Sequence, residues 1–186
     1  RTPLNGIIPM LDLLMNSKLA PDQQDFVRTA YTSSRQMLRI VDDILDYSKL
    51  EANKLQLETT GMNLRDVINS VVRMFQNQAD AKHLAIQVHL DPSLRLAVRG
   101  DPVRLRQVLS NLLSNAIKFT DKGTLTLSVK AKSETRQHHI LRFEVKDTGI
   151  GISPENAGSL FKPFSQADAS TTRLYGGTGL GLVICK

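Results

Sequence analysis

Residues 111–120 read N-L-L-S-N-A-I-K-F-T, and this stretch decides the fold of the second half of the chain. It closes a helix that we expect to start at Asp101, with Pro102 directly behind it. The helix has an apolar face made of Leu105, Val108, Leu109, Leu112, Leu113 and Ile117. Asn111 and Asn115 are four residues apart, so they share one side of the helix beside Lys118.

Two asparagines within an apolar helix are costly unless their amides have partners. An amide oxygen suits Mg²⁺, which takes few protein ligands and keeps most of its waters. Lys118, one turn beyond Asn115, could contact a phosphate. Alternatively, both asparagines are caps or core amides that hydrogen-bond to the backbone. The residues of this stretch leave both interpretations open.

A second motif, D-T-G-I-G-I, runs from Asp147 to Ile152 directly after a predicted strand. Gly149 and Gly151 allow the backbone to turn tightly and to approach a ligand. A carboxylate at the end of a strand can accept a hydrogen bond from an exocyclic amine such as that of adenine. The alternative is a simple turn from strand to helix.

The third motif is G-G-T-G-L-G-L, Gly176 to Leu182, at the start of the last predicted helix. Backbone amides and the helix dipole at such a position favour phosphate. The motif is not the dinucleotide fingerprint, because position 182 holds leucine where a third glycine is needed, and no Gly-Lys-Ser/Thr follows to make a P-loop. The chain therefore has three nucleotide-type features and neither of the two commonest nucleotide motifs.

The pattern around these motifs predicts an α+β domain. Alternation of apolar and polar residues indicates strands at 84–90, 124–132 and 139–146. Asn63 and Ser153 are the expected caps of two further helices. Helices on one face of a mixed sheet explain why each strand has one apolar side. Residues 165–178 are rich in Ser, Thr, Gly and Asp and are expected to form a mobile loop.

The N-terminal segment predicts two helices, over residues 4–16 and 21–52. The second carries a seven-residue repeat at Phe26, Ala30, Ser33, Met37, Ile40, Ile44 and Tyr47. One helical hairpin cannot cover two wide apolar faces, so we expect a homodimeric four-helix bundle; the alternative is a hairpin packed on its own C-terminal domain. The domains are placed at 1–58 and 59–186, with a hinge at Thr59–Met62.

Composition narrows the function further. Residues 1–58 hold seven Lys and Arg against eight Asp and Glu, whereas residues 59–186 hold seventeen against ten. The basic residues of the second domain are scattered and lack interleaved aromatic residues, so nucleic-acid binding is not expected. The single Cys185, the lack of a membrane-spanning stretch and the lack of a secretory signal predict a cytoplasmic portion, compatible with a membrane-anchored parent.

The order of the motifs resembles the catalytic domain of sensor histidine kinases. Its N-box, G1 box, F-box and G2 box correspond to 111–120, 147–151, 161–164 and 177–181. The opening R-T-P-L-N-G-I resembles the stretch after the phosphoacceptor histidine of the dimerisation domain, and S-T-T-R-x-Y-G-G-T-G-L-G-L resembles the hybrid type. The resemblance implies a Bergerat ATP-binding fold, an α/β sandwich shared with gyrase B and Hsp90, with ATP and Mg²⁺ as ligands and a receiver-domain aspartate as the final phosphoryl acceptor.

Site residues follow from the resemblance position by position. It implies Asn115 as the Mg²⁺ ligand with Asn111 beside it, Lys118 and Arg173 as phosphate contacts, and Thr2 as the residue that orients a water for dephosphorylation. The remaining nucleotide-binding positions are Phe119, Asp147, Gly149, Gly151, Ile152, Gly177, Thr178, Gly179, Leu180 and Gly181.

The chain departs from the family pattern at its ends. The resemblance places the phosphoacceptor histidine three residues before Arg1, and the four histidines of the chain all lie between 83 and 139. The last helix is expected to continue beyond Lys186, so we expect truncation at both ends. Two alternatives remain: a gyrase-type ATPase, disfavoured because Asn111 stands where those enzymes have a glutamate base, and a dimerisation scaffold without catalysis.

Overall fold

The structure is a computed structural model that describes all of the 186 residues except 1, 136–137, 166–178 and 186. The chain divides into two compact units, Arg1–Leu55 and Gln56–Lys186. Each unit is described separately. No helix in the described ranges is both long and apolar enough to cross a membrane.

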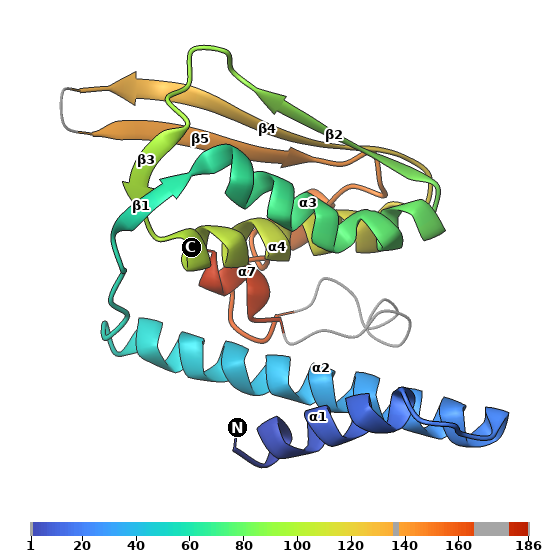
Figure 1. The fold of residues 1–186 in the computed structure, drawn as a ribbon. Helices are drawn as coiled ribbons and strands as arrows, with labels where there is room; N and C mark the ends of the chain where they lie inside the picture. The colour runs from blue at the N-terminus through green and yellow to red at the C-terminus, as the bar shows by residue number, and fades with distance from the viewer. Residues whose placement is uncertain (1, 136–137, 166–178, 186) are drawn as a thin grey trace. The chain divides into compact units, whose positions relative to one another are not determined.

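The first unit is a helical hairpin of α1 (Thr2–Met15) and α2 (Pro21–Glu51), which lie side by side (Figure 1). Apolar side chains recur on one side of α1 at helical spacing and are half-buried: Leu4, Ile8, Leu11 and Met15. Pro21 occupies the first position of α2, as expected of a residue without an amide hydrogen. The two predicted N-terminal helices are therefore confirmed.

The second unit contains β1 (Thr60–Asn63), α3 (Leu64–Ala81), β2 (Leu84–Leu90), β3 (Ala97–Gly100), α4 (Pro102–Phe119), β4 (Gly123–Glu134), β5 (His139–Lys146), α5 (Pro154–Ala157) and α7 (Gly181–Ile184). The main sheet has the order β2-β4-β5, with β2 parallel and β5 antiparallel to β4. Helices α3 and α4 cover one face of this sheet (Figure 1). The predicted mixed sheet with helices on one face is confirmed.

Two short strands were not predicted, and they correct the position of the hinge. β1 pairs antiparallel with β3, from Thr60 opposite Gly100 to Asn63 opposite Ala97. Residues 60–62 are therefore held in a strand, and the hinge predicted there is wrong. The segment without regular structure before β1 is 54–59. Each of these strands has only four residues, too few for alternation to be recognised in the sequence.

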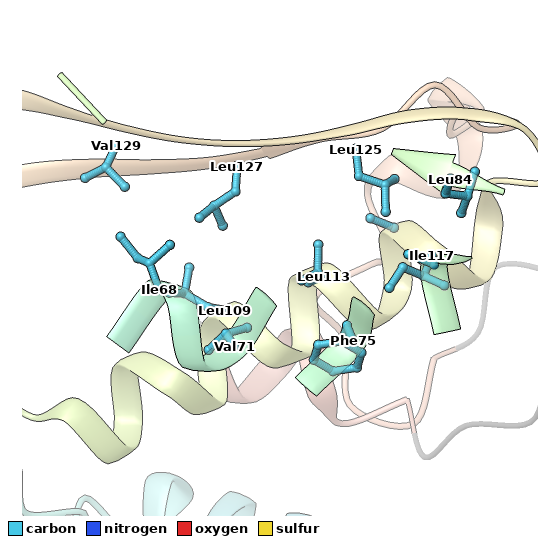
Figure 2. Close-up of a cluster of buried hydrophobic side chains, with 12 residues drawn as sticks. Ile68, Val71, Phe75, Leu84, Leu109, Leu113, Ile117, Leu125, Leu127 and Val129 are labelled. Carbon is cyan, nitrogen blue, oxygen red and sulfur yellow. The ribbon is translucent and has the colours of Figure 1, made fainter. Parts of the chain in front are cut away.

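The core of the second unit lies between α3, α4 and β4. Figure 2 shows side chains of α3 and α4 pointing toward Leu125, Leu127 and Val129 of β4. Leu109 and Leu113 on α4 have no exposed surface. Burying one such side chain stabilises the fold by about 1.5–3 kcal/mol. This packing fixes one face of α4 and leaves its other sides to contact the loops.

The start of α4, predicted at Asp101, is fixed by the side chain of that residue. Asp101 Oδ1 accepts hydrogen bonds from the amides of Val103 and Arg104, both at 3.0 Å, and Oδ2 accepts one from the Glu58 amide at 3.0 Å. The Arg104 amide, followed by the Glu58 amide, lowers the pKa of Asp101. One carboxylate thus caps α4 and ties the segment before β1 to it.

Candidate functional site

The C-terminal end of α4 contacts the turn that follows β5. The Ile150 amide donates a hydrogen bond to the Phe119 carbonyl at 3.3 Å. A Cβ atom on Gly149 would collide with that carbonyl oxygen, and it would lie 2.9 Å from the Phe119 carbonyl carbon and from Thr120 Oγ1. Position 149 therefore accepts only glycine, because the two backbones touch. The first and second motifs are neighbours in the fold.

The D-T-G turn is held by its own polar side chains. Asp147 Oδ1 accepts a hydrogen bond from the Gly149 amide at 2.9 Å. Thr148 Oγ1 accepts one from the Thr124 amide at 3.1 Å and so joins the turn to the start of β4. Gly151 has a positive φ of 71°, which favours glycine. The Asp147 carboxylate at the start of the turn is exposed.

Asn111, in the middle of α4, contacts Gly181 of the third motif. Asn111 is only 6% exposed, and its Nδ2 donates a hydrogen bond to the Gly181 carbonyl at 3.2 Å. Gly181 is the first residue of α7, and Leu180 before it has no exposed surface. Asn111 therefore makes the bond of a core amide to a backbone carbonyl. That bond brings together motifs that are 70 residues apart.

Asn115 and Lys118 lie in different surroundings from Asn111. Asn115 is half-buried, and no hydrogen bond joins its side chain to another described residue. Lys118 Nζ lies 4.9 Å from the centroid of the Phe119 ring, and burial lowers the pKa of its amine. No group of three or more His, Cys, Asp or Glu side chains among the described residues could hold a metal. A divalent cation here would need ligands other than a carboxylate cluster.

The F-box packs against Gly179 of the third motif. Gly179 has a φ of 68°, and a Cβ there would lie 2.9 Å from the Phe164 carbonyl carbon and from the Ser165 oxygen. Ile152 is 62% exposed. Arg173, Gly177, Thr178 and nearly all of the loop expected at 165–178 lie outside the described residues. Thr2 is exposed and begins α1 in the other unit.

Sequence reasoning missed Thr120 as a residue of this site. It follows α4, has no exposed surface and packs its hydroxyl beside Gly149. Thr120 Oγ1 is buried, and the described part of the chain provides no hydrogen-bond partner for it. Such a group costs free energy unless a water or a ligand satisfies it. The sequence carries no signal for this, because the burial of Thr120 depends on contacts with distant parts of the chain.

Two family models match the chain. Residues 1–53 match the His Kinase A (phospho-acceptor) domain, and residues 100–186 match the histidine kinase-, DNA gyrase B-, and HSP90-like ATPase. A catalytic domain of the histidine kinase ThkA is 30% identical with a TM-score of 0.56, over 69% of this chain and 77% of that one. The chain belongs to the sensor histidine kinase family. The prediction made from the motifs is confirmed.

Longer relatives match over the full length of this chain. The sensor protein GacS of Pseudomonas syringae pv. syringae is 47% identical over all of this chain and 20% of its own length. The histidine-protein kinase BarA of Escherichia coli (strain K12) is 41% identical with the same coverage. The hybrid signal transduction histidine kinase A of Dictyostelium discoideum is 44% identical over all of this chain and 9% of its own length. The chain thus spans about a fifth or less of the length of these curated relatives.

A solved structure matches both units. Full-length ShkA, crystallised in complex with AMPPNP, is 32% identical with a TM-score of 0.77 over 99% of this chain and 37% of that one. The helical N-terminal region followed by an α/β sheet domain is therefore the fold of this kinase chain and of its relative.

The contact between Gly149 and Phe119 leads to a stability prediction. Gly149→Ala should lower the free energy of unfolding by about 1–3 kcal/mol, because the added methyl overpacks against backbone that cannot rotate away. Gly158→Ala is the matched control, since its Cβ would meet nothing within 4 Å and its φ is −70°. Urea unfolding followed by circular dichroism measures both. Equal midpoints for the two variants would show that the contact is not tight.

Proposed function

We propose that this kinase chain is the cytoplasmic core that binds MgATP and supplies the γ-phosphoryl group for a histidine upstream of Arg1. The observation that carries the proposal is the meeting of three motifs on α4: Asn111 bonds to Gly181, and Phe119 bonds to Ile150. The resemblance of the motifs and the AMPPNP complex of ShkA support a nucleotide at this place. In the parent protein the phosphoryl group then passes to a receiver-domain aspartate.

Asp147 is proposed to select adenine. The Gly149 amide bonds to its Oδ1, and no described residue bonds to its Oδ2, which leaves this oxygen to accept from the exocyclic amine. The exposed Ile152 and the half-buried Phe119 provide apolar surface for the base. The unpartnered Thr120 hydroxyl, beside Gly149, fits a role in holding a water or a ring nitrogen of the base.

Asn115 and Lys118 are proposed to act on the phosphate side. The Asn115 side chain makes no hydrogen bond to a described residue, and its amide oxygen is a ligand that Mg²⁺ accepts. Mg²⁺, when bound, neutralises charge on the phosphates. Lys118 adds a second cation, and Gly179 to Gly181 at the start of α7 provide backbone close to Asn111. Arg173, Gly177 and Thr178 are proposed to complete the contacts.

The proposed reaction transfers the γ-phosphoryl group from the β–γ bridging oxygen of ATP to a histidine nitrogen. A histidine nitrogen attacks the γ-phosphorus, an N–P bond forms, and the bond to the β–γ bridging oxygen breaks as ADP leaves. Because charge gathers on the phosphate oxygens, positioning and cations carry most of the catalysis. Asn111 provides an amide in place of a base that could activate water, which favours transfer over hydrolysis. Thr2 is proposed to orient water when the receiver is dephosphorylated.

ATP affinity tests the proposed site. Asp147→Ala should weaken ATP binding roughly 10- to 100-fold, because a charge-assisted hydrogen bond contributes about 1.5–3 kcal/mol. Asn115→Ala should abolish the gain in affinity that Mg²⁺ gives to the wild-type chain. Asn77→Ala, on the exposed side of α3, is the control and should bind normally. Isothermal titration with and without Mg²⁺ measures all four chains. A wild-type chain that binds no ATP would leave only the scaffold alternative.

The hairpin is proposed to dimerise through an apolar face, here called the open face, that lies outside the contact between α1 and α2. Its residues have exposed fractions between 36% and 71%: Ile7, Met10, Leu13 and Leu14 on α1, and Phe26, Met37, Ile40, Ile44 and Leu45 on α2. An apolar face of this extent marks an interaction surface. The match to the phospho-acceptor domain supports a second copy as the partner, in a four-helix bundle.

The mass in solution tests the dimer. The wild-type chain should have twice its 20.7 kDa mass in solution, and the double variant Met37→Glu/Ile44→Glu should have a mass of 20.7 kDa. Association of the variant is opposed because each copy would have to bury two glutamates of its open face in the interface. Arg28→Glu/Gln36→Glu, on other sides of α2, is the control and should remain dimeric. Light scattering after size exclusion gives these masses. A monomeric wild type at micromolar concentration would contradict the dimer.

Labelling with γ-phosphate-labelled ATP tests the chemistry. A longer chain that includes the upstream histidine should form an acid-labile, alkali-stable adduct, which is characteristic of phosphohistidine. The 186-residue chain should stay unlabelled, because its four histidines all lie between 83 and 139. A longer chain without that histidine is the control. Rapid ATP hydrolysis without an adduct would favour the gyrase-type ATPase instead.

A further inference from the structure

The C-terminal end of α4 has no cap of its own. Its last helical residue is Phe119, and Thr120 turns directly into extended backbone with φ −113° and ψ 121°. The final carbonyls of a helix have no partner within the helix and need one from elsewhere. The residue after Thr120 is Asp121, where helices usually have a glycine in the left-handed conformation. The end of α4 therefore depends on groups from other parts of the fold.

Lys82 supplies most of these bonds. Its Nζ donates to the carbonyls of Ile117 at 2.9 Å, Lys118 at 3.2 Å and Thr120 at 3.3 Å. An ammonium has three donors, and a cation at this end of a helix interacts favourably with the helix dipole. The remaining carbonyl, that of Phe119, accepts from the Ile150 amide. Two tertiary partners thus complete the end of α4.

The turn after α3 places Lys82 next to the C-terminal end of α4. Lys82 is the C-cap residue of α3, and His83 after it has a left-handed φ of 54° with its amide bonded to the Asp80 carbonyl at 2.9 Å. Lys82 Nζ also lies 3.9 Å from Asp121, whose side chain is 79% exposed. So exposed an ion pair contributes little. The carbonyl bonds are therefore what holds the ammonium in place.

We propose that Lys82 is a positioning residue of the nucleotide site. It fixes the last turn of α4, which carries Lys118 and Phe119 and receives the Gly149–Ile150 turn. Its charge also offsets the partial negative charge at the end of α4, which would otherwise oppose a polyphosphate nearby. The inference rests on the proposed ATP binding, and it assigns a role to a residue that lies outside all the nucleotide motifs.

The test compares Lys82→Met with Lys82→Arg, with Lys132→Met on the exposed side of β4 as the control. Lys82→Met should weaken ATP binding about tenfold, because the charge and the bonds are lost while the volume is kept. It should also speed hydrogen exchange of the Ile150 amide, and leave the amides of the β2–β4 pairing as protected as in the wild type. Lys82→Arg should restore affinity to within about threefold, since a guanidinium also donates to carbonyls. Lys132→Met should change neither quantity.

The outcomes separate this inference from the proposed function. A wild-type chain that binds no ATP contradicts the proposed function itself. A wild-type chain that binds ATP, with Lys82→Met equally tight, overturns the positioning role alone. Equal acceleration of exchange throughout the second unit also overturns it, because Lys82 would then be a general stabiliser. If Lys82→Met does not fold, Lys82→Gln, which keeps one amide donor group, replaces it. This variant is then expected to bind ATP more weakly and to exchange the Ile150 amide faster than the wild type.

Discussion

The contact between the end of α4 and the turn after β5 is the constraint on which the site depends. The Phe119 carbonyl accepts from Ile150, and Gly149 leaves no room for a side chain against it. Because α4 is fixed by its buried apolar face on the sheet, this contact transfers the rigidity of the core to the turn that carries Asp147. A polar turn at the surface is thereby joined to an element of the core by a backbone hydrogen bond and a close backbone contact.

Asn111 and Asn115 show how one helix can contribute both to the protein core and to the proposed site. They are the same residue type four positions apart, and the structure gives them different surroundings. Asn111 is buried and bonded to the Gly181 carbonyl, so it fixes α7. Asn115 is half-buried without a hydrogen bond to any described residue, so its amide is suited to a ligand. A buried amide costs free energy unless it has a partner. At Asn111 the partner is the Gly181 carbonyl, and at Asn115 we propose that it is Mg²⁺.

The two units differ in what they leave exposed. The hairpin has an open apolar face, which is the property of a surface that another protein covers. The second unit has a closed apolar core between α3, α4 and β4, and it also exposes single apolar side chains such as Ile150 and Ile152 in the turn after β5. Membership of the sensor histidine kinase family accounts for both: one unit is matched by a phospho-acceptor domain and the other by an ATPase-type domain.

Much of this was readable from the sequence, because periodicity, capping residues and glycine spacing are local properties. The hairpin, the caps Asn63 and Asp101 and the three main strands follow from neighbours in the chain. The strands β1 and β3 do not, because each is defined by a partner about 37 residues away. Thr120 and Lys82 are likewise ordinary in sequence. Their roles exist only where α3, α4 and the Gly149 turn meet, and only the tertiary structure decides which carbonyls a lysine 35 residues away can reach.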